Sequence, residues 1–355
     1  MAYLFVPGPV DVDPGVAQAQ ARPMIPHRSK EFEEIFHRAA NKSKALFGTQ
    51  YRVFISTSSG TGLHEAAVRN LSKERILACV NGAFGKRWFD VAVTNGKAAD
   101  KLDVEWGQPV TAEMVAEALE KGHYDLVTVV QNETSTGLMN PVDEIAAAVR
   151  EVSPDTIVAV DAVSSLSGAP MKMDEWGIDF VLTSSQKALA LPPGISLAAV
   201  SDRALERAES VPNRGWYFDL LRLEKHRIKN STPATPAVAL VYALDVQMDR
   251  ILAEGVEARW ERHLAMSERV HQWALERGFG LFAAEGYRSY TVTTVANTHK
   301  IDIGDLNAFL LQRGMRLANG YGDLKNKTFR IAHMGEVHME DLNTLLAAID
   351  DYMAQ

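Results

Sequence analysis

The stretch Ile157-Val158-Ala159-Val160-Asp161 is an apolar run that ends in a carboxylate, and the next apolar run, Asp179-Phe180-Val181-Leu182-Thr183, is followed by Ser184-Ser185-Gln186-Lys187. Both runs are nearly continuous in aliphatic and β-branched residues, which is typical of strands covered on both faces of a largely parallel sheet. The carboxyl ends of such strands are where open α/β sheets bind their ligands. Asp161 and Lys187 are therefore candidate functional residues.

Similar apolar runs occupy 53–55, 75–80, 126–130 and 197–200, and they alternate with helical patterns. This alternation predicts an α/β fold of the doubly wound kind. Beyond residue 237 the pattern changes to long helices and then to a looser α+β tail, with strands expected at 290–295 and 329–332. We therefore predict a large domain with an N-terminal arm over residues 1–250 and a smaller C-terminal domain over residues 251–355.

The composition excludes several classes of function. The 355 residues carry a net charge of −8, so no strongly basic face is expected for nucleic acid. No apolar run approaches the roughly 20 residues of a membrane span, and the N-terminus lacks the features of a signal peptide. The single cysteine, Cys79, fits a reducing compartment. We expect a cytoplasmic protein that binds neither nucleic acid nor membrane.

Lys187 and Asp161 together match the needs of pyridoxal phosphate. That cofactor takes an amine for an imine link and an anion opposite its ring nitrogen, which keeps the ring an electron sink. An apolar, turn-rich segment, 188–194, follows Lys187. Partial desolvation there is expected to lower the lysine pKa towards the range in which the neutral amine acts. Each residue also has a plain structural interpretation: a lysine at a strand end, and an aspartate that caps a turn.

Other polar segments follow predicted strands. Thr57-Ser58-Ser59-Gly60-Thr61-Gly62 joins a strand to a helix, as a phosphate-binding turn does, but it matches neither the dinucleotide nor the Walker pattern. Phe84 lies between two glycines and could stack on a heteroaromatic ring. Arg330, in a strand of the tail, could hold a substrate carboxylate. A simple turn, a core aromatic and a structural ion pair are the competing interpretations.

Three blocks in order resemble a known family: Glu133-Thr134-Ser135-Thr136-Gly137, Val160-Asp161-Ala162-Val163-Ser164-Ser165 and Ser185-Gln186-Lys187-Ala188-Leu189. They resemble the class V aminotransferases of the fold-type-I pyridoxal phosphate family, and most of all the alanine–glyoxylate/serine–pyruvate group. The resemblance runs from Val6-Pro7-Gly8-Pro9 to Phe329-Arg330-Ile331. It implies a large, mostly parallel three-layer α/β/α domain and a smaller α+β domain.

The resemblance also implies roles for individual residues. Lys187 would carry the Schiff base and Asp161 would face the pyridinium nitrogen, while Val163 and Phe84 would enclose the ring. The phosphate and its surroundings would be held by Ser59, Gly60, Thr61 and Gln186, with Thr134 near the ring oxygen. The α-carboxylate of the substrate would bind Arg330, with Gly8 beside it. A homodimer would share its sites, with Thr235, or else Thr232, reaching the partner's phosphate.

The implied reaction is a ping-pong transamination from a small amino acid, alanine or serine, to a 2-oxo acid, glyoxylate or pyruvate. Two departures from the family pattern are visible: Phe84 replaces a common tryptophan, and Thr61 replaces a histidine found in some members. The main alternative is a phosphoserine aminotransferase that uses glutamate and 2-oxoglutarate, because His27-Arg28 resembles the pair that such enzymes use for substrate phosphate. A non-catalytic binding protein on the same fold is the second alternative.

Three further classes are disfavoured by particular residues. A cysteine desulfurase needs a thiol on a mobile loop, whereas Cys79 lies within an apolar strand run. A metal site at His333 and His338 lacks carboxylate or thiol partners at ligand spacing, so no metal is expected. A nicotinamide-dependent dehydrogenase would require the glycine fingerprint that this chain lacks.

Overall fold

The computed structural model describes residues 3–355. Within them, seven strands form a large sheet in the order β2-β10-β9-β8-β5-β3-β4, and only β10 runs against the others. The strands are β2 (Arg52–Ser56), β3 (Arg75–Val80), β4 (Ala98–Asp103), β5 (Leu126–Val130), β8 (Ile157–Asp161), β9 (Phe180–Ser184) and β10 (Ser196–Val200). The expected mostly parallel sheet is thereby confirmed.

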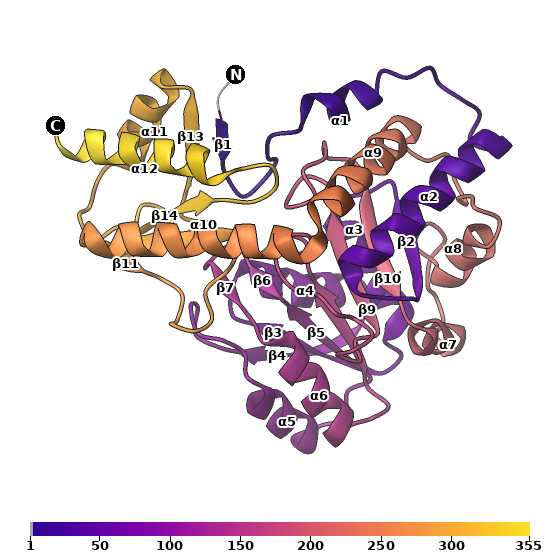
Figure 1. Cartoon of the computed structure of the whole chain (residues 1–355). Coiled ribbons are helices and arrows are strands. Elements are labelled where there is room, and N and C mark those ends of the chain that lie inside the picture. Colours follow the sequence, from indigo (N-terminus) through magenta and orange to yellow (C-terminus); the bar gives the residue numbers. More distant parts are fainter. Residues whose placement is uncertain (1–2) are drawn as a thin grey trace.

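Helices cover both faces of this sheet (Figure 1). Val127 and Val129 of β5 enter one hydrophobic cluster, and Leu126 and Val130 enter another on the opposite face. On the first face, the cluster is completed by five helices: α1 (Pro14–Ala19), α2 (Lys30–Phe47), α5 (Ala112–Lys121), α6 (Val142–Val152) and α9 (Val238–Glu254). On the opposite face, the cluster is completed by four helices: α3 (Gly60–Leu71), α4 (Ala83–Thr94), α7 (Asp202–Ser210) and α8 (Leu220–Arg227). These are the expected three layers. Because helices cover both faces of the sheet, side chains on both faces of strands such as β5 are buried, and the sequences of these strands are nearly continuous apolar runs.

A second sheet has the order β1-β13-β14-β12-β11 among the described residues. Its strands are β1 (Tyr3–Phe5), β11 (Gly280–Leu281), β12 (Val292–Ala296), β13 (Met315–Asn319) and β14 (Thr328–Ala332), and α10 (Val256–Glu276), α11 (Ile303–Gln312) and α12 (Met339–Met353) pack on it. A 3-10 turn, η1 (Gly322–Leu324), precedes β14. The N-terminal strand β1 pairs with β13, so the arm begins in the C-terminal sheet. The boundary near residue 250 stays a prediction.

The two sheets are connected by a helix pair and a buried arginine. Gly255, at φ +90°, separates α9 from α10, a conformation that glycine adopts readily. Arg259 in α10 is almost fully buried and donates to the carbonyls of Ala188 and Gly335, each at 3.1 Å. It also pairs with Glu336. Arg259 therefore holds the segment after Lys187 against the smaller sheet.

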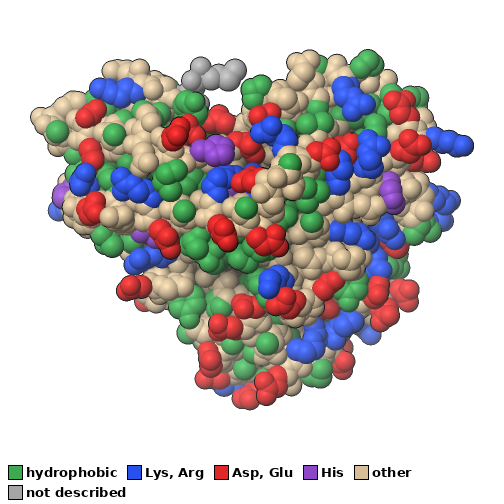
Figure 2. All heavy atoms as spheres, viewed as in Figure 1, with side chains coloured by type: hydrophobic (Ala, Val, Ile, Leu, Met, Phe, Trp, Pro, Cys, Tyr) green, Lys and Arg blue, Asp and Glu red, His purple; other side chains and the backbone are tan. Residues whose placement is uncertain are grey.

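Acidic and basic side chains are interspersed on the face drawn in Figure 2. Along residues 3–355, none of the helices combines the length and the apolarity that crossing a bilayer would require. The same residues contain no group of three or more histidine, cysteine or acidic side chains that could hold a metal ion.

Candidate active site

The carboxyl ends of β8 and β9 place the two central candidates at one edge of the large sheet. Asp161 is the last residue of β8 and is 3% exposed, and Lys187 follows the end of β9 and is half-buried. Desolvation lowers the pKa of Lys187 to about 8, helped by the positive charges of Arg330 and Arg87 and opposed by Asp161. A larger fraction of neutral amine is therefore available near neutral pH than in an exposed lysine, although the ammonium form still predominates.

The N-terminal segment lies directly over Lys187. The ammonium of Lys187 donates to the carbonyl of Pro7. Gly8, at φ +87°, approaches so closely that an added Cβ would lie 2.6 Å from Cδ of Lys187 and 2.7 Å from the carbonyl oxygen of Gln186. No other residue type fits this position without displacing the lysine. The structure thus brings Gly8 to Lys187 and Gln186.

Asp161 is held by two donors inside the protein. Its Oδ1 accepts the backbone N–H of Val163 at 2.7 Å, and its Oδ2 lies 2.7 Å from Nε2 of His64. The His64 ring stacks on Trp88 with ring centroids 4.2 Å apart. The sequence reasoning missed His64, because a lone histidine on an apolar helix face gives no sign of its partner.

The turn between β2 and α3 has free backbone donors that could form an anion cradle. Ser59 caps α3 without a side-chain hydrogen bond, and the first backbone N–H groups of a helix have no acceptor within it. A Cβ added to Gly60 would lie 2.6 Å from Cγ2 of Val163. Glycine at this position therefore lets the cradle approach the segment that follows Asp161. Thr61 faces Arg87, whose Nη1 lies 3.4 Å from its hydroxyl.

Two further segments complete this edge. Glu133 is fully buried, and its Oε2 accepts the backbone N–H groups of Phe84 at 2.9 Å and Gly85 at 3.0 Å. This carboxylate ties the start of α4 to the β6 (Asn132–Glu133) and β7 (Leu138–Met139) hairpin. Burial raises the pKa of Glu133, against the effect of these donors. Thr134, the next residue, pairs with Ser164 through their hydroxyls at 2.7 Å.

Arg330 supplies a buried cation without an acidic partner. It lies in β14, is 9% exposed, and donates to the carbonyls of Thr134 at 3.3 Å and Asn319 at 3.1 Å. Desolvation lowers its pKa to about 10, although the guanidinium stays charged at neutral pH. Among residues 3–355, no carboxylate lies within ion-pair distance of it. Such a group is suited to a carboxylate brought by a ligand.

Arg87 is a second cation that the sequence reasoning missed. Its guanidinium lies 4.8 Å from the centroid of the Phe84 ring and 3.5 Å from the hydroxyl of Tyr321. Phe84 and Tyr321 are themselves 5.7 Å apart, ring centroid to ring centroid. These residues come from α4 and from the turn before β14. Only the folded chain shows that they meet.

Some of the residues expected at the site lie elsewhere in the single chain. Arg28 donates to the hydroxyl of Ser231 and, at 2.6 Å, to the carbonyl of Thr232. Thr232 is buried and donates its hydroxyl to the carbonyl of Ala234, whereas Thr235 is exposed. His27, the neighbour of Arg28, is half-buried. The expected roles of Thr235 and Thr232 depend on a partner subunit, and those of His27 and Arg28 concern substrate binding. All four stay predictions.

Comparison with known proteins places this geometry in a family. The family model named Aminotransferase class-V matches residues 16–323. The chain belongs to this family. An uncharacterized aminotransferase of Methanocaldococcus jannaschii is 38% identical, with 98% of this chain and 91% of that protein covered. The L-aspartate–glyoxylate aminotransferase of Paracoccus denitrificans is 32% identical, with coverages of 94% and 86%.

A solved structure, alanine–glyoxylate aminotransferase from Nostoc, matches with a TM-score of 0.93 at 28% identity, over 99% of this chain and 95% of that one. The protein is thus an aminotransferase, and its family uses pyridoxal phosphate. The residues present fit that cofactor: a buried carboxylate, a lysine of lowered pKa and a glycine-lined anion cradle lie at one sheet edge. The buried Cys79 thiol, with its pKa raised to about 12 by desolvation, does not resemble a desulfurase nucleophile.

Proposed function

We propose that this aminotransferase moves an amino group from a small amino acid, such as alanine or serine, to glyoxylate or pyruvate. The observation that carries the proposal is the unpaired, buried guanidinium of Arg330 beside Lys187, since together they provide a carboxylate anchor and a proton-transfer group. Relatives named for glyoxylate as acceptor, with aspartate, alanine or serine as donor, support this substrate range.

Each side chain has a distinct task in this proposal. Arg330 binds the α-carboxylate and so orients the bond from Cα to hydrogen. Lys187 would attach the cofactor, and its Nζ, when free, would take the proton from Cα. Asp161 would face the ring nitrogen. When bound, pyridoxal phosphate supplies the electron sink for the negative charge that develops at Cα.

Enclosure and phosphate binding fall to the remaining residues. We infer that Val163 and Phe84 pack against the two ring faces, with Thr134 near the ring oxygen. The cradle of Ser59, Gly60 and Thr61, together with Gln186, would hold the phosphate. Gly8 and Pro7 cover Lys187 and would limit the entry of water from the N-terminal side.

A substrate panel tests the proposal. Half-reactions of the holoenzyme with alanine, serine, aspartate, phosphoserine and glutamate are followed by the change in visible absorbance. We expect alanine or serine to have the highest kcat/KM. We also expect Arg330→Gln to lower it by about 100-fold, because a charged, directed contact to the carboxylate is lost. A preference for phosphoserine or glutamate would instead favour the phosphoserine aminotransferase alternative, and the absence of any half-reaction would favour the non-catalytic one.

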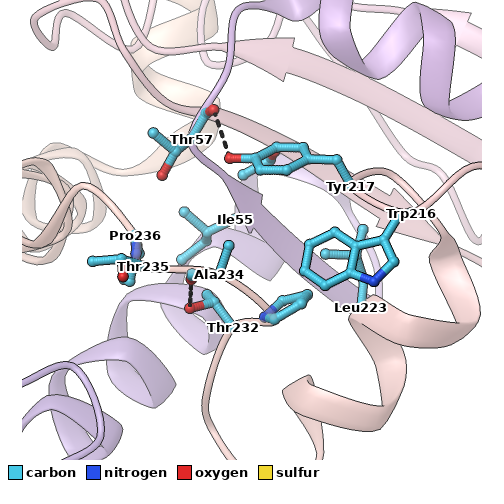
Figure 3. Close-up of a pocket in the computed structure, with 11 residues that line it drawn as sticks. Ile55, Thr57, Trp216, Tyr217, Leu223, Thr232, Ala234, Thr235 and Pro236 are labelled. Atoms are coloured by element: carbon cyan, nitrogen blue, oxygen red, sulfur yellow. Dashed lines mark hydrogen bonds between the residues drawn. The ribbon is translucent and has the colours of Figure 1, made fainter.

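We also propose a homodimer that shares its active sites. Thr235 is exposed beside Trp216 and Tyr217, which are 53% and 42% exposed. Figure 3 shows these residues around a shallow hollow that also reaches Thr57, which lies just before the turn between β2 and α3. Exposed aromatics next to a site are typical of interfaces. The hydroxyl of Thr232 is already bonded to Ala234, which favours Thr235 as the residue that reaches the partner's phosphate.

Trp216→Glu is expected to convert the dimer to monomer, because it places a charge in the centre of the proposed interface. The molar mass of the protein in solution, measured by light scattering, would fall by half, and cofactor affinity would fall with it. Leu311→Glu is the matched control. Leu311 is also an exposed apolar residue, but it lies on α11, which packs on the smaller sheet and outside the proposed interface. A monomeric wild-type protein that is fully active would contradict the shared site.

The location in the cell is a further proposal. The chain has one cysteine, and that cysteine is buried. A protein without disulfides is suited to a reducing compartment, and we infer that it works in the cytoplasm.

A further inference from the structure

A buried histidine outside the set of proposed site residues contacts the central carboxylate. His64 lies in the second turn of α3 and is 2% exposed, with Nε2 2.7 Å from Oδ2 of Asp161. The flat side of its ring rests on Trp88, at an interplanar angle of 24°. The ring is therefore fixed in place and orientation, and its nitrogen points at the group expected to face the cofactor's ring nitrogen.

The surroundings of His64 determine its tautomer. Its Nδ1 is buried and has no hydrogen-bond partner within residues 3–355. Nε2 faces the carboxylate, whereas Nδ1 has no partner, so a hydrogen on Nε2 gives the ring a hydrogen bond to Asp161. His64 is then the donor and Asp161 the acceptor. The other ionisable groups near this edge are Lys187, Arg330, Arg87 and the buried Glu133.

We propose that His64 is a positioning residue that holds the Asp161 carboxylate in one orientation, and that through Asp161 it sets how strongly the pyridine nitrogen of the bound cofactor would hold its proton. With the N–H of Val163 on Oδ1 and that of His64 on Oδ2, both oxygens of the carboxylate have a donor. Neither oxygen is left free to rotate away from its partner, so the carboxylate is fixed in orientation. This inference rests on the proposed role of Asp161.

The position of His64 in α3 adds a geometric consequence. Gly60 begins this helix, and His64 lies four residues later, one turn along it. The same helix holds His64 against Asp161, and its N-terminus would face the phosphate of a bound cofactor. Asp161 and the phosphate cradle are in this way kept at a fixed separation by one element rather than by two loops.

Variants of His64 test the proposal on the holoenzyme. His64→Leu removes the donor, and His64→Gln retains an N–H at a similar distance from the backbone. We expect His64→Leu to weaken pyridoxal phosphate binding by about tenfold, because the loss of one hydrogen bond to a charged group changes an affinity by about that factor. We also expect it to shift the pH titration of the bound cofactor's visible absorbance. Gln should restore most of both properties. Both readouts are independent of turnover.

Val68→Ala is the matched control, because Val68 is a fully buried residue one turn further along the same helix. It should lower the melting temperature while leaving the cofactor titration unchanged. If His64→Leu does not fold, His64→Asn is used in its place. The asparagine side chain is too short to reach Asp161, so His64→Asn should show weaker cofactor binding and a shifted titration, whereas His64→Gln should not. A donor-free variant that binds and titrates like wild type overturns the inference. A wild-type protein that binds no pyridoxal phosphate would instead overturn the proposed site itself.

Discussion

Replacing Lys187 with alanine is expected to lower turnover by at least about 10³-fold and to leave pyridoxal phosphate without a covalent bond to the protein. Lys187 supplies both the amine for attachment and the proton-transfer group, and burial lowers the pKa of this amine to about 8. Single-turnover kinetics with alanine, and the visible spectrum after the protein is freed of unbound cofactor, measure the two effects separately.

Lys121→Ala provides the control for this prediction. Lys121 is exposed at the end of α5, and within residues 3–355 its ion-pair partner is Glu117, one turn away. Such exposed pairs contribute little, so its loss should leave turnover and spectrum unchanged. A Lys187→Ala protein that keeps its activity would show that the amine of Lys187 is not the reacting group.

Asp161→Asn is expected to reduce kcat by about 100-fold or more, because a neutral amide cannot balance a protonated ring nitrogen and the electron sink is weakened. The amide oxygen can still accept from Val163. The amide NH₂, however, would face the N–H of His64, and the histidine must change tautomer or leave a donor unpaired. We therefore expect a change in the cofactor's absorbance as well as a slower half-reaction.

Asp125 offers a matched carboxylate for comparison. It is buried and accepts from the backbone N–H groups of Lys73, Glu74 and Arg75, but it precedes β5 and so lies at the opposite edge of the sheet. Asp125→Asn should destabilise the protein and leave kcat nearly unchanged. Equal losses of kcat in the two variants would mean that Asp161 acts only through stability.

Much of the large sheet could be predicted because burial on both faces leaves a simple trace in the sequence. Runs such as 126–130 and 157–161 are apolar throughout, and the polar residues that follow them point to the functional edge. This signal alone leads to Asp161 and Lys187 as candidates, and the structure places both at that edge. The reversed direction of β10 was not, since strand composition does not encode orientation.

Contacts between distant segments were beyond the reach of sequence patterns. The short strand Tyr3–Phe5 pairs with β13 near the other end of the chain, and nothing local to either segment indicates the pairing. His64 and Arg87 were missed for the same reason. Each lies on a helix whose apolar residues already account for its packing on the sheet. The contact that brings each residue to the site is made with a residue of another element, Asp161 for His64 and Tyr321 for Arg87.

Reductive trapping of the bound cofactor tests the central claim most directly. Apoprotein is mixed with pyridoxal phosphate over a range of pH, the imine is reduced with borohydride, and the modified peptide is identified by mass spectrometry. We predict modification at Lys187, with a rate of capture that rises with pH until the pKa of about 8 is passed and then levels off, because only the neutral amine reacts. Modification of a different lysine would contradict the account. So would a capture rate whose pH midpoint lies at the ordinary lysine pKa instead of near 8.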